Sequence, residues 1–235
     1  MTTRRKRARG PGRPKADSAG DLRSELLETS RELLKEGGPN ALSMREVARR
    51  AGCTHQAPYH YFEDRETILA TLVAEGFDEL AQRLRAANDL AESDGVRSAL
   101  LASGHAYVDF ALSQPGVFRV MFRPDVCNPA RFPLLLQAGG QAYTELKRLT
   151  GIVHGADASP AQSTILWAHV HGLACLLVDG PLAMQVDSKP AREAHLLEVA
   201  ERFANLILPA RIATDSRRTR TRIRGTSKSA TDADP

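Results

Sequence analysis

Apolar residues recur at three- and four-residue intervals along most of the chain, which is the spacing of helices that bury one face. Glycine and proline pairs separate these runs and set the ends of the predicted helices. We find no pair of strands and no internal repeat with a period of roughly 20–50 residues. The pattern therefore predicts an all-α protein. Its helices are expected at residues 21–36, 44–51, 54–62, 65 to beyond 84, 94–114, 117–122, 129–150, 160–180 and 189–208.

The segment Leu42–Phe62 predicts two short helices joined by a tight turn. Ser43 is expected to cap the first helix, and Glu46, three residues later, completes a capping box. Gly52 permits a backbone turn that a larger residue would strain. Thr54 is then expected to cap the second helix. Two short helices joined in this way form a helix-turn-helix, a motif that docks in the major groove of DNA.

Four parts are expected along the chain. A three-helix bundle containing the helix-turn-helix occupies residues 21–66, and a larger helical domain occupies residues 67–208. A basic arm at residues 1–20 and a basic tail at residues 209–235 flank these domains. Both ends are expected to be disordered, because they contain few residues that could build a core.

Charge is segregated between these parts. Residues 1–15 hold seven basic residues and no acidic one, and residues 209–235 hold seven basic against three acidic residues. Because the formal net charge of the chain is +4, residues 16–208 carry a net charge of −7. Basic ends on an acidic body favour contact with nucleic acid, since Lys and Arg release counterions from phosphates. The tail at 209–235 fits a solvated segment equally well.

Composition favours a helical protein of the cytoplasm. Aromatic residues make up only 5% of the chain, so the core must rest on Leu, Val and Ala. The three cysteines are far apart and lack metal-ligand spacing, which suits reduced thiols. No apolar segment follows the basic N-terminal residues, so no signal peptide is expected. The most apolar stretch, residues 165–184, contains His169, His171, Asp179 and Pro181 and is expected to be a buried helix, not a membrane span.

Residues 44–69, MREVARRAGCTHQAPYHYFEDRETIL, resemble the tetracycline-repressor (TetR) family of bacterial transcriptional regulators. The shared order is an Arg at the start of the helix at residues 44–51, an Ala-Gly turn, a capping Thr, aromatic residues, an acidic pair and a basic residue. The length and helical layout also fit. The matching residues are Arg45, Ala51, Gly52, Thr54, Tyr59, Tyr61, Phe62, Glu63, Asp64 and Arg65.

The resemblance implies DNA contacts for the helix-turn-helix. Gln56 is the best candidate for reading a base, because an amide can pair bidentately with adenine. Arg45 and Arg65 are expected to bind phosphates from the N-terminal ends of their helices. Tyr61 could equally be half-buried packing, and His60 could simply cover the surface. The implied DNA-binding residues are Arg45, Thr54, His55, Gln56, Ala57, Tyr59, His60, Tyr61 and Arg65, whereas Phe62 is expected in the core.

Two positions depart from the family pattern. The helix expected at residues 54–62 is the recognition helix, the one that enters the major groove. Pro58 stands in it where the family usually has an apolar residue with a backbone N–H. Because Pro58 lies about four residues into that helix, we expect it to remove only one helical hydrogen bond. Arg65 stands where Lys is common, which keeps the charge but changes how it meets a phosphate.

The arm also contains a candidate DNA contact. Gly12-Arg13-Pro14, flanked by basic residues, resembles an AT-hook, a short extended segment that inserts Arg into a narrow minor groove. Arg13 is therefore a further candidate DNA-binding residue.

In the resembling family, the C-terminal region forms a ligand pocket and a dimer interface made by the last two long helices. Here these are residues 160–180 and 189–208, and their apolar positions exceed what one pair of helices needs to bury. A two-fold dimer would present paired recognition helices to a pseudo-palindromic operator. The apolar positions include Leu166, Val170, Leu173, Leu177, Leu196, Val199, Phe203 and Leu206.

Trp167, His171 and Gly172 resemble a C-terminal subtype of the family named for its Trp-His-Gly pattern. Trp167 and His171 are four residues apart and therefore share a helix face. They could lie at an effector pocket, or they could only pack, with His171 bonded to a backbone carbonyl. The candidate ligand-binding residues are His105, Phe110, Met121, Phe122, Tyr143, Trp167 and His171.

No motif indicates an enzyme, a metal site or a cofactor: the chain lacks a Gly-rich phosphate loop, a nucleophile elbow and a zinc-type His-Glu motif. The predicted function is a homodimeric repressor that binds a palindromic operator in double-stranded DNA and is released by a small, apolar effector. Three alternatives stay open: activation in place of repression, an architectural nucleoid-type protein without an effector, and a ligand-binding dimer whose DNA role is vestigial.

Overall fold

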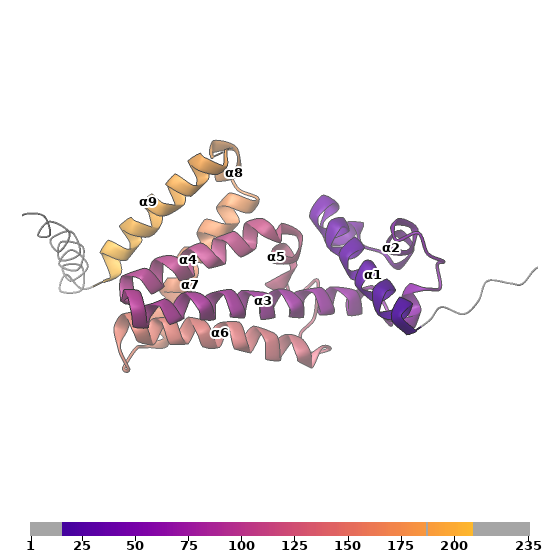
Figure 1. Ribbon diagram of the computed structural model, residues 1–235, viewed down its shortest axis with the longest axis horizontal. Coiled ribbons are helices and arrows are strands. Elements are labelled where there is room, and N and C mark those ends of the chain that lie inside the picture. The colour runs from indigo at the N-terminus through magenta and orange to yellow at the C-terminus, as the bar shows by residue number, and fades with distance from the viewer. Residues whose placement is uncertain (1–15, 187, 209–235) are drawn as a thin grey trace, which may run out of the picture. The chain divides into compact units, whose positions relative to one another are not determined.

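The computed structural model describes residues 16–186 and 188–208, and these form helices and connecting turns without a strand (Figure 1). The all-α fold predicted from the apolar pattern is therefore confirmed. Residues 1–15, which include Arg13 and its AT-hook-like motif, lie outside the described residues, as does the tail at 209–235.

Contacts divide the chain into two compact units, one ending at Leu72 and the other beginning at Val73. The division falls inside the long helix α3, Arg65–Asp94. It lies six residues beyond the boundary at 66/67 that the sequence suggests. Each unit has buried residues of its own.

The first unit contains the predicted helix-turn-helix. It consists of α1 (Ala16–Gly37), the 3₁₀ helix η1 (Pro39–Ala41), α2 (Met44–Arg50), the 3₁₀ helix η2 (Pro58–His60) and the start of α3. Helix α1 packs against both η1 and α2, and α2 packs against η2. The guanidinium of Arg23 lies over the ring of Phe62, 5.4 Å from its centre. The buried side chains include Leu26, Leu33, Leu34, Val47, Ala48, Phe62, Ile68 and Leu69.

Helix α1 begins at Ala16, five residues before the start that the apolar pattern indicates. Residues 16–20, assigned from the sequence to the arm, are thus helical backbone. The pattern marks only where apolar side chains begin to repeat. A helix can extend beyond that point, because each added residue contributes a backbone hydrogen bond without needing a buried side chain.

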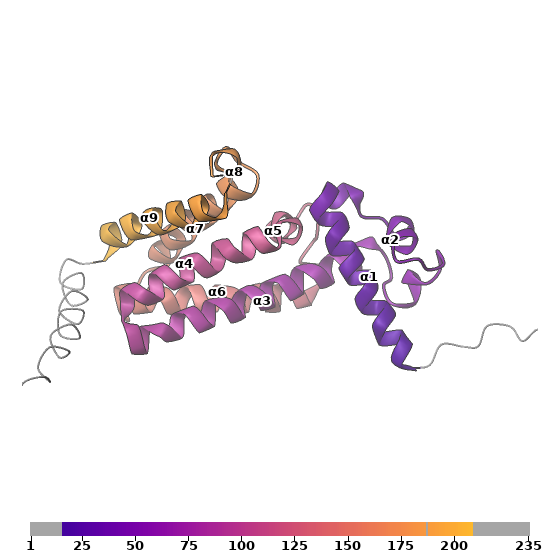
Figure 2. The same ribbon diagram turned by 45° about the horizontal axis from the view of Figure 1, so that its top comes forward.

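The second unit is a larger helical bundle. Helix α4 is its centre and packs against α5, α6, α7 and α9. Helix α6 runs alongside α3 in both views (Figures 1 and 2), and a hydrogen bond of 3.0 Å from Arg85 Nε to Glu145 Oε1 joins these two helices. The helices that follow α3 are α4 (Val96–Ser113), α5 (Pro115–Met121), α6 (Pro133–His154), α7 (Pro160–Val178), α8 (Leu182–Gln185) and α9 (Lys189–Ile207).

Helix α6 starts four residues later than expected, at Pro133 instead of Pro129. Asn128 explains the difference, because its side-chain Oδ1 accepts the N–H of Ala130 at 3.0 Å and its carbonyl accepts the N–H of Arg131 at 3.1 Å. These bonds close a turn that competes with a helix start. The next proline then occupies the first turn of the helix, where its missing N–H costs nothing.

The capping box predicted at Ser43 is only half formed. Ser43 Oγ accepts the N–H of Glu46 at 3.1 Å, but the Glu46 carboxylate bonds arginine side chains and not the N–H of Ser43. A complete capping box occurs instead at Ser159 and Gln162, where both reciprocal bonds are present at the start of α7. The sequence Ser-Pro-Ala-Gln carries that signal, and we did not predict it.

Candidate nucleic-acid interface and ligand cavity

The turn after α2 has the geometry that the sequence predicts. Gly52 has φ of +64°, and a Cβ added there would meet nothing within 4 Å. The N–H of Cys53 then bonds the carbonyl of Ala48 at 3.0 Å. The side chains of Val47 and Ala48 are buried, so the inner face of α2 is part of the core. Glycine is therefore required at residue 52 for its backbone conformation and not for space.

The recognition segment is not the α-helix expected at residues 54–62. Its N–H groups bond carbonyls three residues earlier, and Pro58–His60 forms the 3₁₀ helix η2. Pro58 has no N–H to give the carbonyl of Thr54, and its ring crowds that carbonyl. The expectation that only one bond would be lost is wrong, because the bonds from Thr54 to Tyr61 span three residues, and only the N–H of Phe62 reaches the carbonyl four residues earlier, that of Pro58, at 2.9 Å. The bonds run from Ala57 N to Thr54 O, Tyr59 N to Gln56 O, His60 N to Ala57 O and Tyr61 N to Pro58 O, at 3.0–3.2 Å.

Most of the residues predicted to contact DNA are exposed on this segment. The side chain of Tyr59 is 53% exposed, so its ring and hydroxyl are open to a partner. Tyr61 is half-buried, as one of its two interpretations requires, and Phe62 is 2% exposed and belongs to the core as predicted. The exposed predicted contacts are Arg45, Thr54, His55, Gln56, Tyr59 and His60, whereas Ala57 and Arg65 are partly buried.

The two arginines predicted to bind phosphates have different surroundings. Arg45 is exposed near the start of α2, and no hydrogen bond or ion pair joins it to another described residue. Arg65 is partly buried, and its NH2 group donates to the carbonyl of Pro39 at 2.5 Å. Its Nε is buried without a partner among the described atoms. The guanidinium of Arg45 is thus open to solvent, whereas Arg65 links η1 to the start of α3.

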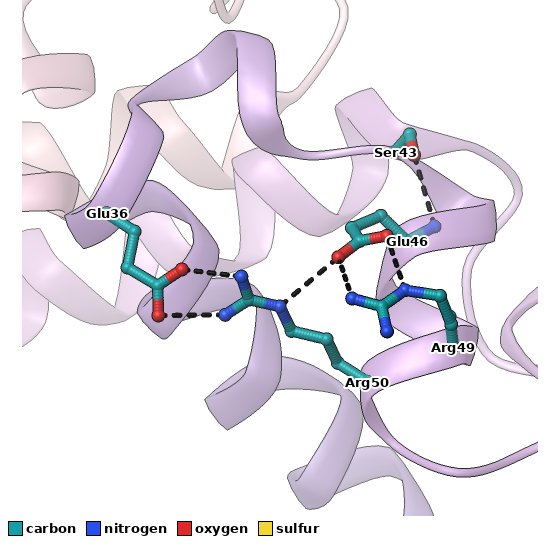
Figure 3. Close-up of polar contacts among 5 residues, drawn as sticks. All are labelled: Glu36, Ser43, Glu46, Arg49 and Arg50. Carbon is teal, nitrogen blue, oxygen red and sulfur yellow. Dashed lines mark hydrogen bonds and ion pairs between the residues drawn. The ribbon is translucent and has the colours of Figure 1, made fainter.

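Two further arginines of α2 are neutralised by neighbouring carboxylates (Figure 3). Arg50 donates to both oxygens of Glu36 on α1, at 2.8 and 2.5 Å, and to Glu46 at 3.2 Å. Arg49 donates to both oxygens of Glu46, at 2.9 and 2.7 Å. The hydrogen bond from Arg49, followed by that from Arg50, lowers the pKa of Glu46 to about 2. The cluster ties α1 to α2, and we did not predict it from the sequence.

The second unit contains a large cavity of about 1370 Å³ that is partly open to solvent. Ligand cavities in proteins commonly measure about 300–1000 Å³, so there is room for a sizeable organic molecule. Phe110 does not line the cavity: it is fully buried beside Gly76, whose added Cβ would lie 3.5 Å from its ring. The predicted ligand-binding residues that line it are His105, Met121, Phe122, Tyr143, Trp167 and His171.

His171 and Trp167 meet at a hydroxyl that we did not predict from the sequence. Tyr107 of α4 lies with its hydroxyl 2.8 Å from His171 Nδ1, and Trp167 Nε1 donates to the same oxygen at 3.4 Å. The expected packing arrangement, in which His171 bonds a backbone carbonyl, is therefore wrong for Nδ1. Burial raises the pKa of Tyr107 well above its usual value and lowers the pKa of His171. At neutral pH both groups are uncharged.

A second set of polar side chains lies at the cavity wall, and its members hydrogen-bond one another. Ser103 Oγ donates to Asn88 Oδ1 at 2.6 Å, and Asn88 Nδ2 donates to Glu145 Oε2 at 3.1 Å and to its carbonyl at 3.0 Å. The buried Glu145 also pairs with Arg85 at 3.0 Å and Arg148 at 3.5 Å. The contacts of Asn88 and Arg85 with Glu145 join α3 to α6 across a long stretch of sequence.

Helices α7 and α9 carry exposed apolar side chains. Ile165 and Leu176 on α7 are 56% and 43% exposed, and Leu197 and Leu206 on α9 are 60% and 83% exposed. Within the described ranges, α7 is the one helix long and apolar enough to cross a membrane by length and composition, and 22% of it is buried. A helix that packs against a second protein chain meets the same two criteria. Three predicted apolar positions, Leu166, Leu177 and Leu196, are instead buried within the protomer.

A helix-turn-helix with an exposed recognition segment, followed by a helical unit with a large cavity, defines a DNA-binding regulator. Comparisons with known families agree. Residues 26–72 match the model described as bacterial regulatory proteins of the tetR family, and residues 100–199 match the tetracyclin repressor-like C-terminal domain. The chain therefore belongs to the TetR family of transcriptional regulators. The Trp-His-Gly subtype is finer than these descriptions and stays a prediction.

Solved structures share this fold, and curated regulators are similar to part of the sequence. A protein of unknown function from Rhodococcus sp. RHA1 is 28% identical, with a TM-score of 0.64 over 79% of this chain and 93% of that one. The TetR family regulator PfmR from Thermus thermophilus is 21% identical, with a TM-score of 0.59 over 79% and 95%. The HTH-type transcriptional regulator Rv1816 from Mycobacterium tuberculosis is 24% identical over 106 residues, and the match covers 45% of each chain.

Proposed function

We propose that the chain is a homodimeric repressor that binds a pseudo-palindromic operator and is released by a small-molecule effector. The proposal is carried by one observation. A chain that belongs to a family of regulators has both an exposed recognition segment and a cavity of about 1370 Å³. The contacts expected with DNA are those of Gln56 and Tyr59 with base edges and backbone, and of Arg45 with a phosphate. No catalytic function is proposed.

The dimer is proposed to form through α7 and α9. Their exposed apolar side chains would be costly to leave in water, and a second copy of the same two helices offers a matching surface. Such an interface also accounts for the apolar composition of α7 in a protein of the cytoplasm, the location that the sequence predicts. Two copies of the recognition segment then read two half-sites.

Effector release is proposed to work by population shift. A ligand in the cavity contacts helices α3 to α7 and α9, and it stabilises those conformations of the bundle that accommodate it. If these differ from the conformations that bind the operator, the ligand and DNA weaken each other's binding by the same factor. Activation would require the opposite preference, and a DNA-release assay separates the two.

The test begins with selection of bound sequences from random DNA by the full chain, followed by footprinting. A discrete palindrome supports the proposal, whereas uniform, salt-sensitive coverage supports the architectural alternative. The double substitution Gln56→Ala and Tyr59→Ala is expected to abolish specific binding and leave the dimer intact. Gln82→Ala, which changes an exposed Gln of the second unit, is the control and should bind normally. Operator binding by the double variant would contradict the assignment of the recognition segment. Effector release is tested by adding fractionated metabolites to the DNA complex.

A further inference from the structure

The cavity of the second unit has few charged groups. None of its lining residues is Lys or Arg, and the carboxylates in its wall already have partners. Glu145 pairs with Arg85 and Arg148, and Glu193 lies 3.8 Å from the ammonium of Lys189. Among the lining side chains, an anionic ligand would find no cation and a cationic ligand would find no carboxylate without a partner. Burying an unpaired charge costs far more than one hydrogen bond returns.

Several of the polar side chains in the cavity wall already form hydrogen bonds with one another. Ser103, Asn88 and Glu145 form one continuous set of hydrogen bonds. His105 and Tyr143 are exposed to solvent, where water competes for their hydrogen bonds. Thr164 donates to the carbonyl of Pro160 at 3.1 Å, and the ring of His169 is stacked on that of Phe203 with their centres 3.6 Å apart. The Tyr107–His171 pair differs from these, because Tyr107 is 5% exposed and a hydrogen bond from its hydroxyl to a ligand would be shielded from water.

The Tyr107–His171 pair has one hydrogen more than its bonds require. Trp167 Nε1 donates to the Tyr107 oxygen, and a single bond of 2.8 Å joins that hydroxyl to His171 Nδ1. If the hydroxyl donates, the hydrogen on His171 Nε2 is left facing only Cys175 Sγ at 3.6 Å, which is a weak acceptor. If His171 donates from Nδ1, the hydroxyl hydrogen is left over. In either tautomer, one donor lacks an oxygen or nitrogen acceptor among the described atoms.

Aromatic rings hold this pair in place. The ring of His171 lies 4.7 Å from that of Phe122 and 5.4 Å from that of Phe118, measured between centres. The rings of Tyr107 and Trp167 lie 6.2 and 6.1 Å away. Packing on several sides holds both rings in place, so the spare hydrogen has a defined position in each tautomer and an acceptor that meets it loses little entropy.

We propose that the cavity binds an uncharged, largely apolar molecule that carries one hydrogen-bond acceptor, such as a carbonyl oxygen, and that the Tyr107–His171 pair donates to it. The inference rests on the proposed function only in taking the cavity to be the effector site. It names the ligand class and the residues that select it. Acids, including free fatty acids, and amines of the same length are excluded as good ligands.

The experiment uses four probes that share eleven carbons: 2-undecanone, undecane, undecanoate and undecylamine. Trp167 is the only tryptophan of the chain and its Nε1 bonds Tyr107, so its fluorescence reports binding at this site directly. Titration of the full-length wild type at pH 7.5 is expected to give saturable binding of 2-undecanone. Undecane should bind about threefold to tenfold more weakly, which is the effect of one hydrogen bond. Undecanoate and undecylamine should bind at least about tenfold more weakly.

Two double variants of matched chemistry then locate the donor. Tyr107→Phe with His171→Phe keeps both rings but removes the pair, so 2-undecanone should lose its preference over undecane. Tyr143→Phe with His105→Phe makes the same change at the exposed Tyr and His of the same cavity, and the preference should remain. The carbonyl stretch of bound 2-undecanone should lie at lower frequency in the wild type and in the control than in the first variant.

The wild-type titration decides the proposal even if a variant does not fold. The proposal is overturned if undecanoate or undecylamine binds as tightly as 2-undecanone, if 2-undecanone binds no better than undecane, or if the ketone shows no saturable binding. Loss of the preference in the control variant alone would also overturn it. The proposed function is judged separately, by release of operator DNA. A ketone that binds with the expected selectivity but leaves the DNA complex intact supports the ligand class and contradicts effector release.

Discussion

Glu46 accepts hydrogen bonds from Arg49 and Arg50, and these bonds keep it ionised far below its usual range. Because its pKa falls from 4.5 to about 2 on folding, it stabilises the fold at pH values above 4.5. That contribution is lost as the pH falls towards 2. We expect the difference in melting temperature between the wild type and Glu46→Gln to shrink across this window.

The measurement is thermal unfolding by circular dichroism at pH 7, 4.5 and 3. Glu32→Gln serves as the control, because Glu32 is an exposed carboxylate on α1 that is not part of the arginine cluster. Its difference from the wild type should change little with pH. A difference for Glu46→Gln that stays constant from pH 7 to 3 would show that the cluster does not contribute to stability.

Gly52 has a positive φ that only glycine adopts without strain. Because an added Cβ meets nothing within 4 Å, Gly52→Ala tests the backbone alone, and we expect a loss of about 1–2 kcal/mol in the free energy of unfolding. Gly151 in α6 also has open space for a Cβ, but no positive φ. Gly151→Ala should therefore stabilise its unit by about 0.5–1 kcal/mol. Urea unfolding measures both, and equal signs for the two variants would contradict the explanation.

At the scale of whole elements, the winding of η2 sets the directions of the side chains that are proposed to face DNA. A 3₁₀ helix turns about 120° per residue and an α-helix about 100°, so the direction of Tyr59 relative to His55 differs by about 80° between them. Pro58→Ala supplies the missing N–H and is expected to lengthen the recognition helix. Affinity for the wild-type operator should then fall at least about tenfold, while non-specific binding is unchanged.

Fluorescence anisotropy with the selected operator measures this effect. Amide chemical shifts of residues 55–61 show whether the helix has lengthened. Pro115→Ala, at the first turn of α5 in the second unit, is the control and should leave operator affinity unchanged. If Pro58→Ala binds the wild-type operator as before, the winding of this segment is not what sets its specificity.

The elements differ in how well their sequences predict them. Helices α4, α7 and α9 have the expected ends within two residues, because glycine, proline and serine act on the backbone locally. The winding of η2 was missed because Pro58 affects several successive bonds, not one. Tyr107 and Glu145 were missed because their partners are 57–64 residues away, and no spacing along the chain reveals such contacts. The arginine cluster was missed because Glu46 was assigned to the capping box, although Arg49 and Arg50 have the spacing of helix ion pairs, and because Glu36 lies 14 residues from Arg50.

At the scale of the molecule, the first unit is acidic where it is described. Residues 16–72 hold ten acidic and seven basic residues, and two of the basic ones are neutralised on α2. The seven basic residues at 1–15 are therefore expected to supply much of the attraction to DNA. Deleting residues 2–15 should lower affinity and flatten the dependence of log affinity on log salt concentration by several units. Deletion of 209–235 gives the comparison, and an unchanged slope without the arm would contradict this role.

Dimerisation determines whether two recognition segments can act together. Ile165→Glu or Leu197→Glu replaces an exposed apolar side chain of α7 or α9 by a charged one, and each dimer contains two copies of the change. We expect dimer dissociation to become at least about a hundredfold easier, equivalent to about 2.7 kcal/mol. Sedimentation equilibrium measures this.

Leu134→Glu is the matched control, because Leu134 is 45% exposed but lies on α6. It should remain a dimer and bind the palindrome normally. The α7 and α9 variants should bind a single half-site as well as the wild type does, since the first unit is unchanged, but should lose the extra affinity for two correctly spaced half-sites. If the α6 variant dissociates and the other two do not, the interface lies on a different face. If the α7 and α9 variants become monomers yet keep full affinity for the palindrome, operator recognition does not depend on the dimer.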